Sequence, residues 1–188
     1  IAGFAVPERK FISREPVYGG LRLAFFFDTS LSMARAEDIK PNRMRAAKDM
    51  VRTLAGMLRY DQELHGRYAL ALIPFAGVSQ PFFLPFTVSH EEFLSNLEEI
   101  NEHTISRQGT GILAALLSYQ SLLEHYPAQR NTTDIAILIS DGGKEEGRAG
   151  ESNFFPAAIR RVREMTKTHV RTGKKVFSWN FLIYTIGV

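Results

Sequence analysis

Residues 21–33 read LRLAFFFDTSLSM, an apolar run that ends at one carboxylate, Asp28, and continues with two hydroxyls, Ser30 and Ser32. A continuous apolar run of this length is typical of a strand buried on both faces of a parallel sheet. Such strands present ligand-binding residues at their carboxyl ends. Hard oxygen ligands gathered there, without a thiol or an imidazole, predict a site for a hard cation such as Mg²⁺.

The five residues from Asp28 to Ser32 also fit a plain polar turn, because Asp and Ser are common in loops. Two later segments favour the cation site. The apolar stretch DIAILIS at 134–140 is followed by Asp141 in a D-G-G turn, although Asp-Gly is itself a turn signal. Thr110 precedes a predicted helix, where it is either an N-cap or a third hydroxyl aimed at the site.

The composition fits one ordinary globular domain. The 188 residues are 45% hydrophobic and 23% charged, and the length suffices for a proper α/β core. The net charge of +3 is too small to indicate a nucleic-acid partner. The absence of cysteine excludes disulfides and thiolate metal sites.

Buried strands alternate with amphipathic helices along the chain, which predicts a Rossmann-like, mostly parallel sheet with helices on both faces. We expect an extended lead-in at 1–20 and one domain at 21–188. Prolines in PFFLPF, at 81–86, place that segment in an antiparallel edge strand, with an exposed recognition patch as the alternative. The predicted strands lie at 21–27, 67–75, 81–86, 134–140 and within 176–188. The predicted helices start near Pro41, Ser89, Ile112 and Ala157.

Each of the four predicted helices carries a specific expectation. Pro41 is placed in the first turn of its helix, and the sequence S-x-x-E at 89–92 predicts a capping box. The predicted buried stripe of the first helix is Met44, Ala47, Val51, Leu54 and Leu58, and that of the helix at 112–123 is Ile112, Leu113, Leu116, Leu117 and Leu123. The basic helix at 157–172 is interpreted as a solvated face or as a contact for an acidic partner or anionic lipid.

The polar positions at the strand ends resemble the metal-ion-dependent adhesion site of von Willebrand factor A (vWA) domains. The five matching positions are Asp28, Ser30, Ser32, Thr110 and Asp141. The resemblance implies that both serines bind the metal directly, that the threonine binds directly or through water, and that the two aspartates act largely through bound waters. The ion would be Mg²⁺, with Mn²⁺ or Ca²⁺ as substitutes, and an Asp or Glu from a protein partner would complete its octahedron.

A narrower resemblance rests on S-M at 32–33, EDIKPNRM at 37–44, QGT at 108–110 and YTIGV at 184–188. These segments are similar to bacterial Bat-type (aerotolerance operon) vWA proteins, which are membrane-anchored and typically encoded beside MoxR-type AAA+ ATPases. The resemblance implies a parent protein anchored in the inner membrane with a periplasmic domain. Because the chain starts at Ile1 and stops inside an apparent strand, we expect a piece of a longer protein, lacking the last helix or strand of the family's fold.

The resulting functional expectation is a non-enzymatic, metal-dependent protein-binding module. One alternative is a Mg²⁺-dependent phosphohydrolase of the haloacid-dehalogenase-like type. Those enzymes need a second Asp as general acid and base where this chain has Ser30, which cannot serve. The other alternative is a metal-free scaffold that binds through the edge at 81–86 or through the basic helix.

Overall fold

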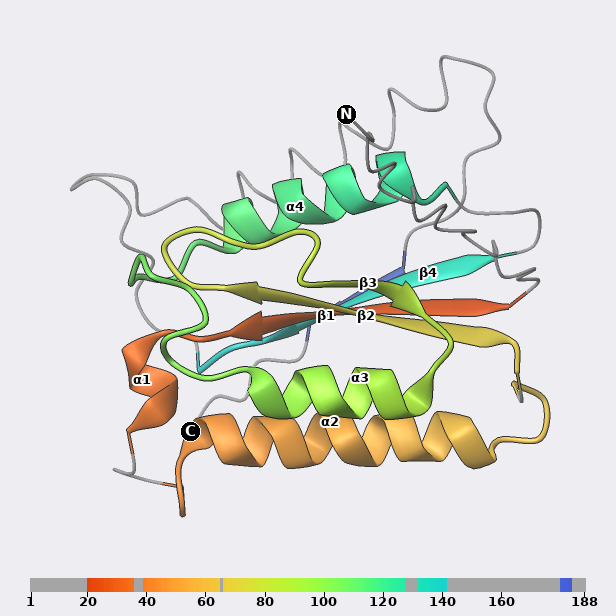
Figure 1. Cartoon of the computed structure of the whole chain (residues 1–188), viewed down its shortest axis with the longest axis horizontal. Coiled ribbons are helices and arrows are strands. Elements are labelled where there is room, and N and C mark those ends of the chain that lie inside the picture. The colour runs from red at the N-terminus through yellow and green to blue at the C-terminus, as the bar shows by residue number, and fades with distance from the viewer. Residues whose placement is uncertain (1–19, 36–38, 65, 128–131, 142–179, 184–188) are drawn as a thin grey trace, which may run out of the picture.

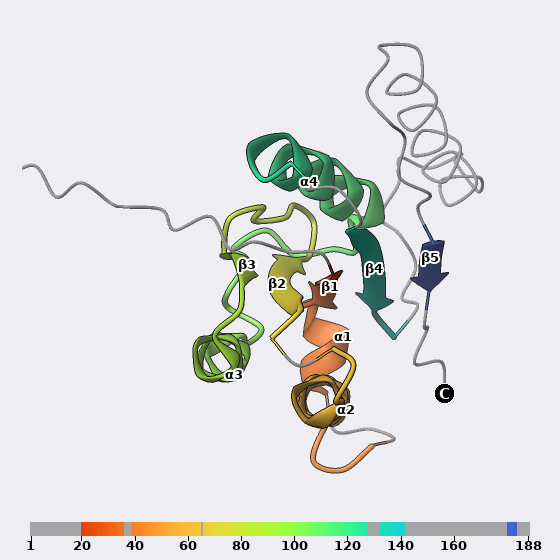
Figure 2. The same cartoon turned by 90° about the vertical axis from the view of Figure 1, so that its right-hand side faces the viewer.

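The computed structural model describes residues 20–35, 39–64, 66–127, 132–141 and 180–183, which form one sheet with helices on both faces (Figures 1 and 2). The strands are β1 (Leu21–Asp28), β2 (Tyr68–Phe75), β3 (Leu84–Thr87), β4 (Thr133–Ile139) and β5 (Asn180–Ile183). The helices are α1 (Leu31–Ala34), α2 (Arg43–Tyr60), α3 (His90–Glu99) and α4 (Ile112–His125). The lead-in predicted at 1–20, except for its last residue, and the basic helix predicted at 157–172 lie outside the described residues, whereas the final strand predicted within 176–188 is β5.

The strand order is β3-β2-β1-β4-β5, with β1 at the centre. β1 runs parallel to both β2 and β4, and β4 runs parallel to β5. β3 pairs with β2 in the antiparallel direction at one edge. The prediction of a mostly parallel sheet with one antiparallel edge strand is therefore confirmed. Parallel strands have their carboxyl ends at the same end of the sheet, here called its carboxyl edge, so the loops after β1, β2 and β4 lie together there.

The apolar run of β1 supplies two hydrophobic cores. Leu23, Phe25 and Phe27 belong to the core under α2 and α3, whereas Ala24 and Phe26 belong to the core under α4. Successive strand residues point to opposite faces, so a strand covered on both faces must be apolar at nearly every position. Figure 2 shows α4 on one side of the sheet and α2 and α3 on the other.

Helix α2 begins at Arg43, two residues after the proline that was placed in its first turn. Asn42 is the N-cap, and its side-chain oxygen accepts a hydrogen bond of 2.8 Å from the backbone N–H of Arg45. The placement of Pro41 inside the first turn is therefore wrong, because an Asn side chain satisfies the free N–H groups of the turn. The predicted stripe is otherwise correct, but Lys48 is also buried and Leu54 is only partly so.

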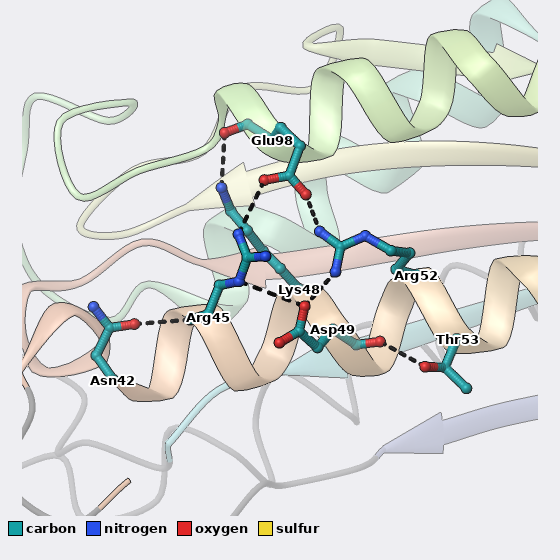
Figure 3. Close-up of polar contacts among 7 residues, drawn as sticks. All are labelled: Asn42, Arg45, Lys48, Asp49, Arg52, Thr53 and Glu98. Atoms are coloured by element: carbon teal, nitrogen blue, oxygen red, sulfur yellow. Dashed lines mark hydrogen bonds and ion pairs between the residues drawn. The ribbon is translucent and has the colours of Figure 1, made fainter. Parts of the chain in front are cut away.

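Polar contacts join α2 to α3 where both helices cover the sheet (Figure 3). The ammonium of Lys48 donates a 2.8 Å hydrogen bond to the backbone oxygen of Glu98. The Glu98 carboxylate pairs with Arg45 at 3.4 Å and with Arg52, which also pairs with Asp49. Burial lowers the pKa of Lys48 from its ordinary value, partly offset by the charge of Glu98.

The first turn of α3 forms only half of the predicted capping box. The Ser89 side chain accepts a hydrogen bond from the Glu92 backbone N–H, as a cap does. The Glu92 carboxylate does not complete the box, since it accepts a 2.5 Å hydrogen bond from the Thr87 hydroxyl instead. Phe93, Leu97 and Ile100 are buried against the sheet as predicted.

Helix α4 is rotated relative to the predicted stripe. Its buried residues are Ala115, Ser118, Tyr119 and Leu122, and Leu117 is 42% exposed. The predicted stripe is correct only in part, since Ile112, Leu116 and Leu123 are partly buried and pack against the core under this helix. The run ILAALL has no helical period, so leucine content alone does not identify the inner face. Small residues let the helix approach the sheet closely, and Tyr119 meets Phe26 edge-on at 5.4 Å between ring centroids.

Candidate functional site

The loop after β1 places the predicted acid and hydroxyls together. Asp28 is the last residue of β1 and is fully buried. Its Oδ1 accepts a 2.8 Å hydrogen bond from the backbone N–H of Ser30. The hydroxyl oxygens of Ser30 and Ser32 lie 3.0 Å apart. The structure therefore brings three of the five predicted ligands into one cluster at the start of α1, whose N-cap is Ser30.

The second oxygen of Asp28 is bound from the neighbouring strand end. The hydroxyl of Ser140, directly after β4, donates a 2.5 Å hydrogen bond to Asp28 Oδ2. Burial raises the pKa of the Asp28 carboxyl above its ordinary value, and the nearby charge of Asp141 raises it further, whereas hydrogen bonds from Ser140 and Ser30 lower it. Sequence reasoning missed Ser140, although its position between β4 and Asp141 matched the strand-end pattern.

Asp141 lies at the same edge and interacts electrostatically with Asp28. Its side chain is 5% exposed, and its Oδ2 accepts a 2.9 Å hydrogen bond from the guanidinium of Arg43, at the start of α2. Sequence reasoning missed this ion pair. The only available signal was that Arg43 immediately precedes Met44, the first core residue of the helix.

Thr110 is buried in the loop before α4, which is attached to the turn after β2. Gly77 N–H donates to the Arg107 oxygen at 2.9 Å, and Gly111 N–H donates to the Ala76 oxygen at 2.5 Å. The Phe75 oxygen in turn accepts a 2.8 Å hydrogen bond from the backbone N–H of the residue after Asp28. This chain of contacts holds the loop of Thr110 at the carboxyl edge of the sheet.

The N-cap role for Thr110 is wrong, since the cap position of α4 is Gly111 and no side chain caps it. Among the described residues, no hydrogen bond joins the Thr110 hydroxyl to the other four predicted ligands. The cap position requires glycine because a Cβ there would lie 2.9 Å from the Ala76 backbone oxygen.

Gly77→Ala is expected to displace the loop of Thr110 and to destabilise the fold by about 1–3 kcal/mol, as overpacking does. The added Cβ would lie 2.3 Å from the backbone oxygen of Gln108, which cannot move without moving the loop. Urea unfolding measures the loss. Gly56→Ala is the matched control, because its Cβ meets nothing within 4 Å and Ala favours the helix by up to about 1 kcal/mol. Equal stability of the two variants would contradict the close packing of this loop.

The donor set at the edge suits a small divalent cation. The Asp28 carboxylate is buried, and the groups of Ser30 and Ser140 that donate hydrogen bonds to it are neutral. A buried carboxylate with neutral partners gains from a nearby cation. Oxygen ligands are those that Mg²⁺ prefers. Within the described ranges, no group of three or more His, Cys, Asp or Glu side chains is placed to hold a metal ion, and this set, with two acids, is not such a group.

Comparison with known proteins agrees with this fold. The family model described as von Willebrand factor type A domain matches residues 23–144. Among curated proteins, none matches the chain in sequence. No helix in the described part of the chain is both long and apolar enough to span a membrane.

Three solved structures show the same architecture. BatB from Bacteroides thetaiotaomicron superimposes with a TM-score of 0.60 at 24% identity, covering 89% of this chain and 66% of that protein. The SpRpn10 VWA domain gives 0.63 at 18% identity, covering 90% and 76%. The PilB minor pilin from Streptococcus sanguinis gives 0.58 at 13% identity, covering 88% and 57%. The chain thus spans less than two thirds of the BatB and PilB structures. By its fold and by the family model that covers most of its length, this chain belongs to the von Willebrand factor type A domain family.

Proposed function

We propose that the chain is a non-enzymatic, metal-dependent protein-binding module whose ion accepts an acidic side chain from a protein partner. vWA domains are typically protein-binding modules and often hold a metal at an adhesion site. The observation that carries the proposal is the fully buried Asp28 carboxylate beside two hydroxyls only 3.0 Å apart.

The ligands in this proposal are Asp28, Ser30, Ser32, Thr110 and Asp141. A bound Mg²⁺, or Mn²⁺ or Ca²⁺ in its place, would supply an electrophilic centre with a position open to a carboxylate. Two acids balance its charge, and the neutral hydroxyls leave it electron-poor. Leu31, 48% exposed between the two serines, gives the rim of the site an apolar contact for the partner.

The proposal also includes a location for the protein, the bacterial cell envelope. The similarity to BatB in fold, together with the segments shared with Bat-type proteins, supports a membrane-anchored parent with a periplasmic domain. A MoxR-type AAA+ ATPase system or another vWA protein would then be the partner. Either must offer an exposed Asp or Glu, because that is the group the ion would bind.

The phosphohydrolase alternative predicts turnover, whereas the binding module predicts none. The residue two positions after Asp28 is Ser30, whose hydroxyl contacts Ser32 and lacks the acid–base capacity of a carboxyl. An aryl phosphate incubated with the chain and Mg²⁺ is therefore expected to remain intact. Turnover that Asp28→Asn abolishes would overturn the non-enzymatic proposal.

Partner capture tests the binding proposal directly. The immobilised chain is expected to retain a protein from an envelope extract of its source cells in Mg²⁺ and to release it in EDTA. Asp28→Asn is expected to retain none. Glu98→Gln changes an exposed charge that pairs α3 with α2 and is not one of the proposed ligands, so this variant is expected to behave like the wild type. Retention that persists in EDTA would support the metal-free scaffold instead.

A further inference from the structure

Arg43 is fixed in place beside the candidate metal site. It is the first residue of α2, directly after the cap residue Asn42. Besides capping α2, Asn42 donates a 3.2 Å hydrogen bond to the backbone oxygen of Ala34, the last residue of α1. Helix α1 contains Ser32 and begins directly after Ser30, in the loop that we call the serine loop. The hydrogen bond of Asn42 therefore holds the start of α2, with Arg43, against the segment that contains Ser32.

The guanidinium of Arg43 already forms an ion pair with one of the proposed metal ligands, Asp141. Its Nη1 lies 2.9 Å from Asp141 Oδ2, in a pair whose side chains are 21% and 5% exposed. An arginine keeps its charge at every physiological pH. At this depth, water screens charges less than it does at an open surface. A divalent ion and the guanidinium therefore repel each other if both approach the Asp141 carboxylate.

We infer that Arg43 is an internal competitor of the metal, a resident cation that neutralises Asp141 in the metal-free protein and must yield when the ion binds. This inference rests on the proposed function and adds a regulation to it. The affinity for the ion is then lower than the five ligands alone would give. Any contact that draws the arginine away, such as an acidic group of the partner, raises that affinity, since coupling between two ligands is reciprocal.

Mn²⁺ titration of the 188-residue chain, followed by the EPR signal of free Mn²⁺, tests the inference. Arg43→Gln is expected to lower the dissociation constant by about fivefold or more, the usual lower range of coupling between sites. Arg43→Lys keeps the charge but loses the planar guanidinium, so its dissociation constant should lie between those of the wild type and Arg43→Gln. Arg45→Gln removes an equal charge two positions along, from a side chain paired with Asp49 and Glu98, and should leave the constant within about twofold.

Melting curves in EDTA show whether each variant folds and supply a second readout. Arg43→Gln should melt below the wild type without metal and regain the difference in saturating Mn²⁺. An unchanged or higher dissociation constant in folded Arg43→Gln would overturn the inference, and a higher one would mean that the arginine orients Asp141 for the ion. If wild type and Arg43→Gln both fold and neither binds Mn²⁺, the proposed function falls with it.

Discussion

Saturating Mg²⁺ or Mn²⁺ is expected to raise the melting temperature of the wild-type chain by about 5–10 °C and to leave Asp28→Asn unchanged. A ligand that binds only the folded state at about 100 times its dissociation constant adds about 2.7 kcal/mol of stability. For a domain of this size, each kcal/mol corresponds to about 2–4 °C. Asp28 is fully buried at the centre of the site, so loss of its charge removes the main electrostatic attraction for the ion.

Asp28→Asn also separates the metal effect from loss of folding. An amide can accept the Ser30 N–H and donate to the Ser140 hydroxyl, so both hydrogen bonds of the carboxylate persist in some form. Scanning calorimetry with EDTA and with excess metal measures both states. A metal-dependent gain in Asp28→Asn equal to that of the wild type would contradict the site.

The pH dependence of the metal-free protein has a defined sign. Burial raises the pKa of Asp28 above the value of 3.8 that it has when exposed. The folded state therefore favours the neutral carboxyl, and this contribution to stability is complete below pH 3.8 and is lost as the pH rises through the higher folded pKa. At neutral pH in EDTA, Asp28→Asn should consequently be more stable than the wild type. Bound metal should reverse that order.

Arg22→Met is expected to destabilise the fold by about 3–5 kcal/mol, because it leaves the buried Asp134 without its cation. Arg22 in β1 and Asp134 in β4 are register partners and are 3% and 2% exposed. The guanidinium binds both carboxylate oxygens, at 2.5 and 2.9 Å, and the Tyr126 backbone oxygen at 2.6 Å. Its carbon also lies 4.4 Å from the centre of the Phe86 ring.

A double-mutant cycle measures the interaction energy between Arg22 and Asp134. Arg22→Met with Asp134→Leu should recover most of the loss, because an apolar pair can replace a buried ion pair at little cost. Glu98→Gln is the matched control, since its ion pairs with Arg45 and Arg52 in Figure 3 are largely exposed and should be worth under about 1 kcal/mol. Urea unfolding at neutral pH measures all four variants. A loss in Arg22→Met no larger than that in Glu98→Gln would contradict the role of burial.

The sheet could be predicted from sequence because its strands are covered on both faces. The uninterrupted run that ends at Asp28 has few other interpretations, and it predicts that Asp28 lies at the carboxyl end of a central strand, which the structure confirms. The position of Ser30 and Ser32 beside Asp28 could be predicted as well, since both serines come directly after the strand. The orientation of α4 could not be predicted in this way, because leucines surround its N-terminal half and the inner face is set by the fit of Ala115 and Tyr119 against the sheet.

Two long-range ion pairs, one buried and one partly buried, were missed for a related reason. Arg22 and Asp134 each occur as one charge inside an apolar strand, 112 residues apart, and only the register of β1 against β4 brings them together. Arg43 and Asp141 are 98 residues apart and meet only through the packing of α2 at the sheet edge. Sequence periodicity describes each element alone, so it gives no information on such pairs.

The central position of β1 has a mechanical consequence for anything that binds at its end. A strand with neighbours on both sides cannot fray as an edge strand does, so the backbone leading into Asp28 opens only when the whole sheet opens. A pulling force on a bound partner would therefore be transmitted straight into the most firmly held segment of the domain. This arrangement suits a binding site that must keep its partner bound under mechanical load.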